Sequence, residues 1–365
     1  GFSGQVVVNT MNHRKESFDT EYDAKATLDA ARHSTIHVQA VHPEDNVGTN
    51  LADELTPLNY YTILSDEEPA SVYTNANLRS FYITQPLQIN MENDSLHMRF
   101  YSPVGIKEVT VMAKSPTMDE YVEFVYIDDI PAFADIKTSI KVLEKGLYRT
   151  ESGKVLQFSA EEMNPASLSL KIACNDPYWT KISQIKAKWY IKFVLNGGNP
   201  VTGTPNKNWW GIRPVHCREA VALFLNIGYM CTLEKFQQRV STFQGTFLDN
   251  NRYPVDTSTL ISRLENLSGF DIGLIYSGNG VSGLGGGRTW GVYQKSFLYH
   301  YENSGGCCST IFYELGHCLG YNHNSTMTYG QWASGCADVF YKNNIKDFPV
   351  NSHTILKSRS NPNIY

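Results

Sequence analysis

The feature that most constrains this chain is the stretch Phe312–Gly330, which reads FYELGHCLGYNHNSTMTYG. Tyr313 and His317 are four residues apart, so in a helix they lie one above the other on the same face. A helix over residues 311–319 would therefore present both side chains to a common ligand. Gly320 suits the left-handed position in which helices often terminate, so we expect the helix to end there.

Four side chains of this stretch form a candidate metal centre. Tyr313 and His317 share a helix face, and the turn after the helix allows His323 to return as a third ligand. Glu314 follows the first ligand and is placed beside the metal, where a general base belongs. The chemistry needs this set because zinc lowers the pKa of a bound water to about 7, and a carboxylate can then take its proton.

The pattern resembles the active site of the metzincin family of zinc metalloendopeptidases, whose signature H-E-x-x-H-x-x-G-x-x-H is followed by a methionine-containing turn. The resemblance implies that Zn²⁺ is held by His317, His323 and the residue at 313, with Glu314 as the catalytic base. It also implies that Met327 forms an apolar floor beneath the metal. Ser325–Tyr329 resembles the S-x-M-x-Y form of this turn, which implies that Tyr329 is a further ligand or a transition-state hydrogen-bond donor.

Tyr313 departs from the family pattern, which has histidine at this position. The interval from His323 to Met327 is also short for the family. Three alternatives follow for Tyr313: it binds zinc through its phenolate oxygen, it marks a natural pseudoenzyme, or it replaces the histidine of an active protease. An unperturbed tyrosine has a pKa near 10, so loss of a histidine ligand should weaken metal binding.

The N-terminal half has the pattern of a β-rich region. Short alternating or β-branched runs lie at 81–83, 96–100, 109–112 and 121–125, separated by turn-forming residues. This spacing is typical of a sandwich-like module. We expect an accessory region over residues 1–185 without a catalytic constellation.

The C-terminal half, residues 186–365, is predicted to be a metzincin-like α/β domain, which makes the fold class of the whole chain α+β. The expected order is a strand at 187–195, a helix after Pro214 with an apolar stripe, a strand at 270–276 and then the signature helix. The glycine-rich run 278–287 has no phosphate-binding lysine, which favours a flexible loop. By the same resemblance, an edge strand at 289–293 would bind an extended peptide.

Composition limits the partners and the location. A formal net charge of −5 argues against nucleic acid as a bulk electrostatic partner. No apolar run approaches the roughly 20 residues that span a bilayer. Six of the seven cysteines lie from Cys217 onward, which favours a few disulfides in the C-terminal half and an extracellular protein. The alternative is that these cysteines are buried free thiols, since cysteine packs well as a small apolar residue.

These features together predict a secreted or cell-surface zinc endopeptidase that hydrolyses protein or glycoprotein substrates, with the activity of this chain left open by Tyr313. The alternative is a catalytically silent pseudoprotease that binds a protein or a glycan. The sequence leaves the oligomeric state and the cleavage preference open.

Overall fold

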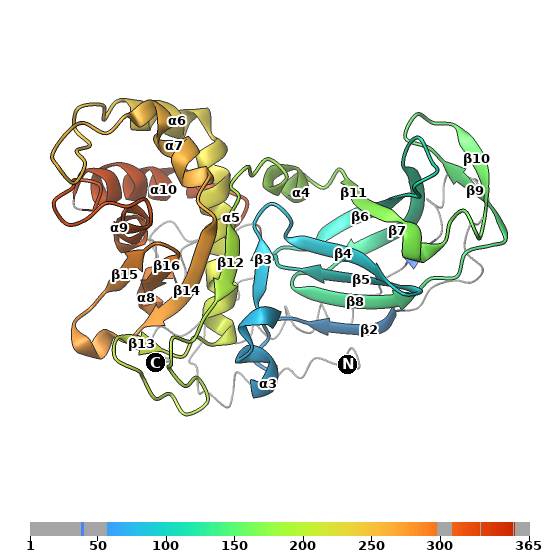
Figure 1. The fold of residues 1–365 in the computed structure, drawn as a ribbon, viewed down its shortest axis with the longest axis horizontal. Helices are drawn as coiled ribbons and strands as arrows, with labels where there is room; N and C mark the ends of the chain where they lie inside the picture. Colours follow the sequence, from blue (N-terminus) through green and yellow to red (C-terminus); the bar gives the residue numbers. More distant parts are fainter. Residues whose placement is uncertain (1–37, 40–56, 298–308, 329, 353, 355–365) are drawn as a thin grey trace. The chain divides into compact units, whose positions relative to one another are not determined.

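The computed structural model describes residues 38–39, 57–297, 309–328, 330–352 and 354 of the 365-residue chain. The structure is mixed α+β, with several small antiparallel sheets in the N-terminal half and a mixed sheet with helices in the C-terminal half (Figure 1). The chain divides into two compact units. Of the described residues, the first unit contains 38–39, 57–63 and 86–180, and the second contains 64–85 and those from 181 onward.

The first unit is built from antiparallel strands. These are β1 (Val38–Gln39), β2 (Pro57–Thr62), β4 (Leu87–Glu92), β5 (Ser95–Phe100), β6 (Ile106–Lys114), β7 (Val122–Ile130), β8 (Ala134–Ser139), β9 (Lys145–Arg149), β10 (Val155–Ser159) and β11 (Ser169–Cys174). One sheet has the order β2-β8-β5-β4 and another has the order β1-β7-β6-β11, while β9 pairs with β10. The unit also contains the short helix η3 (Pro165–Ser167), and α4 (Pro177–Ile182) follows β11.

Buried and more exposed residues alternate along these strands, as expected for sheets with one face on a core. In β5, Leu96, Met98 and Phe100 are buried, and the residues between them are half-buried. The strands predicted at 96–100, 109–112 and 121–125 are confirmed as β5, β6 and β7, and β6 and β7 extend beyond the predicted runs.

The second unit contains a mixed sheet. Its strands are β3 (Ser80–Tyr82), β12 (Tyr190–Phe193), β13 (Trp209–Trp210), β14 (Gly269–Ile275), β15 (Gly283–Gly286) and β16 (Thr289–Val292). The order is β15-β16-β14-β12-β3, and β13 pairs with β14 off this path. Strands β12, β14 and β16 are parallel, whereas β15 and β3 run antiparallel at the two ends of the described sheet.

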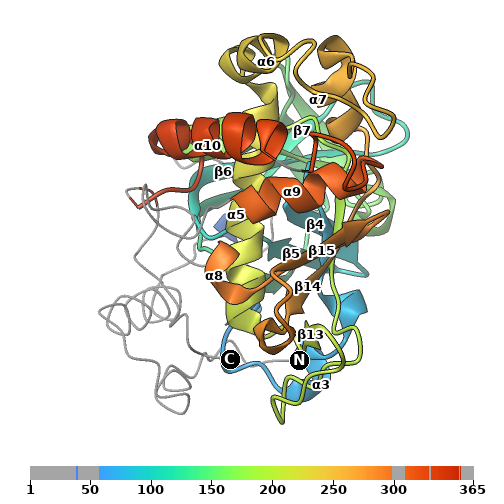
Figure 2. The same cartoon turned by 90° about the vertical axis from the view of Figure 1, so that its left-hand side faces the viewer.

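The described helices of this unit are the long helix α5 (Pro214–Thr232), seen in Figure 2, and several shorter ones. The shorter ones are α3 (Ala70–Tyr73), η2 (Ala76–Leu78), α6 (Glu234–Ser241), α7 (Thr257–Glu265), η4 (Ser277–Asn279), α8 (Gln294–Phe297), α9 (Ser309–Cys318), the π-helix η5 (Gln331–Ala337), α10 (Asp338–Asn344) and η6 (Ile345–Asp347). Helix α5 begins at Pro214, whose fixed φ suits the first turn. Its Phe224 lies 5.2 Å from Phe270 of β14 and 4.9 Å from Trp290 of β16 between ring centres.

Strand β3 comes from the N-terminal half of the sequence but belongs to this sheet. The run at 81–83 was expected among the N-terminal strands. Instead, Phe81 pairs with Ile191 of β12, and Phe81 and Ile83 are fully buried. Whether residues 186–365 form a separate domain stays a prediction.

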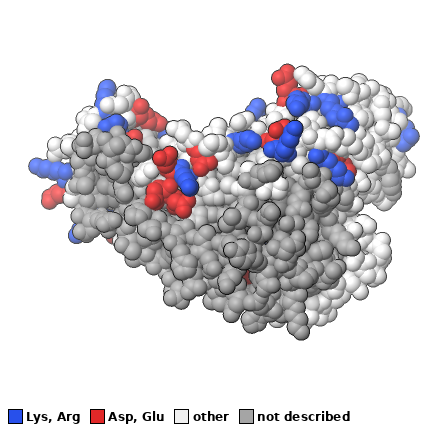
Figure 3. Space-filling model, turned by 180° about the vertical axis from the view of Figure 1, so that it is seen from behind, with Lys and Arg blue, Asp and Glu red and all other residues white. Residues whose placement is uncertain are grey.

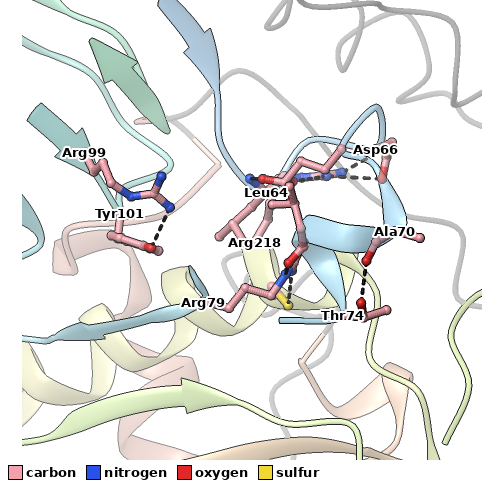
Figure 4. A network of polar contacts seen from close by, with 11 residues as sticks. Leu64, Asp66, Ala70, Thr74, Arg79, Arg99, Tyr101 and Arg218 are labelled. Atoms are coloured by element: carbon pink, nitrogen blue, oxygen red, sulfur yellow. Dashed lines mark hydrogen bonds and ion pairs between the residues drawn. The ribbon is translucent and has the colours of Figure 1, made fainter. Parts of the chain in front are cut away.

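Ion pairs and a hydrogen bond hold the segment before β3 together and fix it to α5 (Figure 4). Arg218 of α5 lies 3.3 Å from Asp66, and the buried Arg79 pairs with the buried Glu68. Arg79 Nη1 also donates to Sγ of Cys217 on α5, at 3.2 Å. A buried charge is costly to leave unpaired, so Arg79 and Glu68 stabilise the segment internally, while the contacts with Arg218 and Cys217 hold it on α5.

The glycine-rich run contains a strand, so the expectation of a flexible loop is wrong. Residues 283–286 form β15, which pairs antiparallel with β16. As a result, β15 takes the end of the sheet and residues 289–292 lie inside it, which corrects the predicted edge strand at 289–293. The absence of side chains at the glycines allows the backbone to approach α9 closely.

The five cysteines that the structure describes are free thiols, namely Cys174, Cys217, Cys231, Cys318 and Cys336. This corrects the expectation of disulfides in the C-terminal half for Cys217, Cys231, Cys318 and Cys336. Four of them are buried, where a thiol packs as a small apolar group. Cys307 and Cys308 lie outside the described residues. In the described part of the chain, no helix has the length and apolar character needed to cross a membrane.

Candidate active site

Helix α9 positions the predicted site residues. Ile311, Phe312 and Leu315 are fully buried and fix one side of the helix in the core. Helix α9 packs against β16, η5 and β15, the last of which is labelled beside it in Figure 2. The indole N–H of Trp290 donates to the carbonyl oxygen of Ile311 at 3.2 Å, and that of Trp332 donates to Phe312 at 2.9 Å. These contacts set the position and rotation of the helix.

The end of α9 is a glycine-terminated turn, as predicted. Gly320 has φ +97°, a left-handed conformation that favours glycine. Its N–H donates to His317 O at 2.9 Å, and the next N–H, of Tyr321, donates to Gly316 O at 3.1 Å. These two hydrogen bonds define a Schellman motif, which reverses the chain and directs residues 322–324 back along the helix.

Three ring side chains converge here, two from α9 and one from the segment after the turn. The ring centres of Tyr313 and His317 are 5.0 Å apart, those of His317 and His323 are 5.0 Å apart, and those of Tyr313 and His323 are 6.1 Å apart. Two imidazoles on one tetrahedral zinc at about 2.1 Å have ring centres about 5 Å apart. The spacing of the two histidines therefore suits a shared cation.

A backbone hydrogen bond orients His317. Its Nδ1 lies 2.7 Å from the carbonyl oxygen of Tyr321. Because a carbonyl only accepts, Nδ1 carries the proton and Nε2 keeps its lone pair for a metal. Burial lowers the pKa of His317, the bond to Tyr321 opposes this shift and the nearby His323 adds to it. Burial and the nearby His323 therefore favour the neutral imidazole, which is the form that binds metals.

Neighbouring segments fix the turn that carries His323. Asn322 N–H donates to Asn250 Oδ1 at 2.7 Å, and Asn250 Nδ2 donates to Gly320 O at 3.1 Å. Arg263 of α7 donates to the Tyr321 hydroxyl at 2.7 Å. His323 itself is exposed, so the open side of the three rings faces solvent.

Met327 lies in a buried turn directly against α9. Its N–H donates to Ser325 Oγ at 2.9 Å, and its side chain is fully buried. A β-carbon on Gly316 would stand 2.3 Å from Met327 O, so a glycine is required where the helix crosses this turn. Tyr329, the other residue expected here, lies outside the described residues.

Glu314 is buried on the opposite side of α9 from solvent, against β15. Only 2% of the residue is exposed. A β-carbon on Gly283 would lie 2.5 Å from its Oε1, and one on Gly285 would lie 2.7 Å from its Oε2. Among the described residues, Oε2 has no hydrogen-bond partner, and burial raises the pKa of Glu314 to about 8. A nearby cation would favour the ionised form and lower this pKa.

Sequence reasoning missed four residues of this site. The Tyr321 carbonyl orients His317 and Arg263 bonds the Tyr321 hydroxyl, and such contacts leave no pattern in the sequence. The alternate glycines Gly283 and Gly285 did leave one, since glycine at every second position suggests close approach of another backbone. Six of the ten histidines of the chain lie outside the described residues, namely His13, His33, His37, His42, His300 and His353.

Within the described ranges, no group of three or more His, Cys, Asp or Glu side chains could hold a metal ion. The three-ring cluster contains two histidines and one tyrosine, so it depends on what Tyr313 contributes. Comparisons with known proteins add no assignment: no family model matches the chain, and neither does any curated protein or solved structure.

Proposed function

We propose that the chain is a zinc-dependent endopeptidase of metzincin type, with its active site on α9. The observation that carries this proposal is the convergence of the Tyr313, His317 and His323 rings, on a helix that also carries the buried carboxyl of Glu314. The proposal includes the finer fold expectations, namely a sandwich-like accessory region and a metzincin-like catalytic domain.

The donor set fits a divalent cation. His317 is held with its Nε2 lone pair available, and the two histidine rings have the spacing of co-ligands. Glu314 Oε2 is a buried polar atom without a hydrogen bond in the described structure, which suggests that a water or a cation belongs beside it. Zinc held by His317, His323 and the residue at 313 would supply Lewis-acid polarisation of water and of the scissile carbonyl.

The protein residues then have separate tasks. Ionised Glu314 accepts a proton from the attacking water and passes it to the nitrogen of the leaving amine. The surrounding burial gives this carboxylate a raised basicity, which suits proton transfer near neutral pH. Strand β15 keeps bulk water away from Glu314. Tyr329 is proposed as a donor to the oxyanion, by resemblance alone.

Strand β15 also provides a place for an extended substrate. It stands at the end of the described sheet, next to α9, and an edge strand can pair with a peptide backbone. On the face seen in Figure 3, the described Lys and Arg side chains stand among Asp and Glu side chains. The formal net charge of −5 supports a protein or glycoprotein substrate over a nucleic acid. Secretion or cell-surface location remains part of the proposal.

Zinc content and cleavage of an unstructured protein test the proposal. The purified chain should contain one zinc per protein and cleave the substrate. Glu314→Gln should retain the zinc and lose about 10²–10⁴-fold in kcat, the usual contribution of a general base. Glu265→Gln, at another carboxyl whose pKa is raised by burial, is the matched control and should retain activity.

Two results would reject the proposed activity. Cleavage that survives Glu314→Gln would show that a different site or a contaminant is responsible. If the chain holds zinc but never cleaves, and Tyr313→His does not restore cleavage, the binding-only alternative is correct.

A further inference from the structure

Tyr313 lies where the third ligand of the proposed zinc site would be. It is one turn before His317 on the same face of α9, and its ring centre is 5.0 Å from that of His317 and 6.1 Å from that of His323. It is half-buried, with its neighbours Phe312 and Glu314 both buried. Tyr313 is therefore part of the ring cluster and is not a surface residue outside it.

The longer side chain of tyrosine agrees with the larger distance between the Tyr313 and His323 ring centres, compared with that between the two histidines. A phenolate oxygen bound about 2 Å from a metal places its ring centre roughly 6 Å from the ring of an imidazole co-ligand, against about 5 Å between two imidazoles. The Tyr313–His323 separation of 6.1 Å matches the first value, and the His317–His323 separation of 5.0 Å matches the second. The Tyr313–His317 separation of 5.0 Å is about 1 Å shorter, a difference that a tilt of the phenol ring takes up.

The competing explanation is simple aromatic packing. Tyr313 and His317 are nearly perpendicular, at 81°, which is a favourable edge-to-face arrangement. This packing accounts for the contact of Tyr313 with His317 but not for the approach of His323, whose turn is held in place by the Asn250 contacts.

We propose that Tyr313 is itself a metal ligand, through its phenolate oxygen, so that the site is a His₂Tyr centre formed with His317 and His323. This inference rests on the proposed function for the location of the metal. On binding, the phenolic proton is released to solvent and the oxygen bonds to the cation. A divalent cation then has a site charge of +1 instead of the +2 left by three neutral histidines. An anionic oxygen ligand also makes the site suit harder first-row cations better than a three-histidine site does.

Copper(II) is the probe, because phenolate bound to Cu(II) absorbs visible light by charge transfer and imidazole does not give the same band. We expect the full chain, stripped of metal with a chelator, to develop this band on addition of one equivalent of Cu(II). Tyr313→Phe should abolish the band and weaken copper binding by at least about 10–100-fold, the loss typical of removing only an outer partner of a ligand. Tyr313→His should abolish the band and keep tight binding.

Two matched variants locate the source of the band. Tyr321→Phe removes a hydroxyl bonded to Arg263 near the site while keeping the carbonyl that orients His317, so the band should remain. Tyr329→Phe tests the other tyrosine of the signature stretch. A band that persists in Tyr313→Phe, or that disappears only in Tyr329→Phe, overturns the proposal. Circular dichroism of each variant shows whether the fold is retained.

The outcome is independent of peptidase activity. A chain that shows the Tyr313-dependent band but cleaves nothing would keep the ligand assignment and reject the endopeptidase. A chain that cleaves in a Glu314-dependent manner without the band would keep the endopeptidase and reject the phenolate ligand.

Discussion

The carboxyl group of Glu314 lies directly against Gly285 of β15. A β-carbon on Gly285 would stand 2.6 Å from the main-chain oxygen of Glu314 and 2.7 Å from its Oε2. The helix that carries the proposed catalytic base therefore approaches the end strand of the sheet at a point where side chains are missing. This contact explains why a glycine-rich segment forms a strand here and why Glu314 is buried.

Gly285→Ala should displace β15 or Glu314. The added methyl group meets backbone, which yields less readily than a flexible side chain, so we expect a loss of about 1–3 kcal/mol in unfolding free energy. The rate of peptide cleavage should fall by more than the loss of folded protein accounts for, because Glu314 is displaced. Gly335→Ala, whose nearest atom would be at 3.3 Å, is the control. Denaturant unfolding and cleavage rates measure both effects, and an unchanged Gly285→Ala protein would contradict the contact.

The metal-free protein should lose stability as the pH rises, because of Glu314. Burial raises its pKa from 4.5 to about 8. The folded chain therefore holds a proton that the unfolded chain has released between these values. The contribution of this retained proton to the free energy of unfolding is complete below pH 4.5. It decreases by at most about 1.4 kcal/mol per pH unit and is lost above pH 8.

Urea unfolding in a chelator at several pH values checks this prediction. Glu314→Gln cannot titrate, so the difference in unfolding free energy between the two proteins should change with pH in the same window. Parallel pH profiles would show that the carboxyl is not desolvated in the folded protein.

Phe81→Ala should destabilise the second unit, although Phe81 is separated in the sequence from the main part of this unit by residues 86–180. Phe81 is fully buried on β3, and truncating a buried phenylalanine costs about 3–5 kcal/mol. Tyr82→Ala, next along the strand with 53% of the residue exposed, should cost much less. Fluorescence of the buried Trp189, Trp290 and Trp332 reports on this unit during unfolding. Equal effects of the two substitutions would argue against the pairing of β3 with β12.

His97 in the first unit should make stability depend on pH. Its ring nitrogens each lie 2.7 Å from a carboxylate, of Asp135 and Glu92. The hydrogen bond to Asp135 raises the pKa of His97, burial opposes the shift and Glu92 adds to it. The resulting stabilisation is complete below the ordinary pKa of 6.5 and is lost as the pH rises through the raised value.

His97→Gln should remove this loss of stability at higher pH while preserving a polar side chain. Chemical unfolding from pH 6 to 9, followed by a signal from the first unit, measures the difference. A wild-type profile that is flat over this range would contradict the paired arrangement of His97.

The sequence by itself determined the local features of the site. The four-residue spacing of Tyr313 and His317 placed both rings on one helix face, and Gly320 marked the helix end, because these depend on helix geometry alone. The strands β5, β6 and β7 were predictable for the same reason, since alternation and turn residues act over short distances.

Only the tertiary structure decided which of these segments meet. It joined β3 to β12, placed β15 instead of residues 289–292 at the end of the described sheet, and left the five described cysteines as free thiols. It also buried Glu314 against Gly285 and oriented His317 through the Tyr321 carbonyl. Strand partners and buried polar contacts depend on residues far apart in the chain, so no local pattern specifies them.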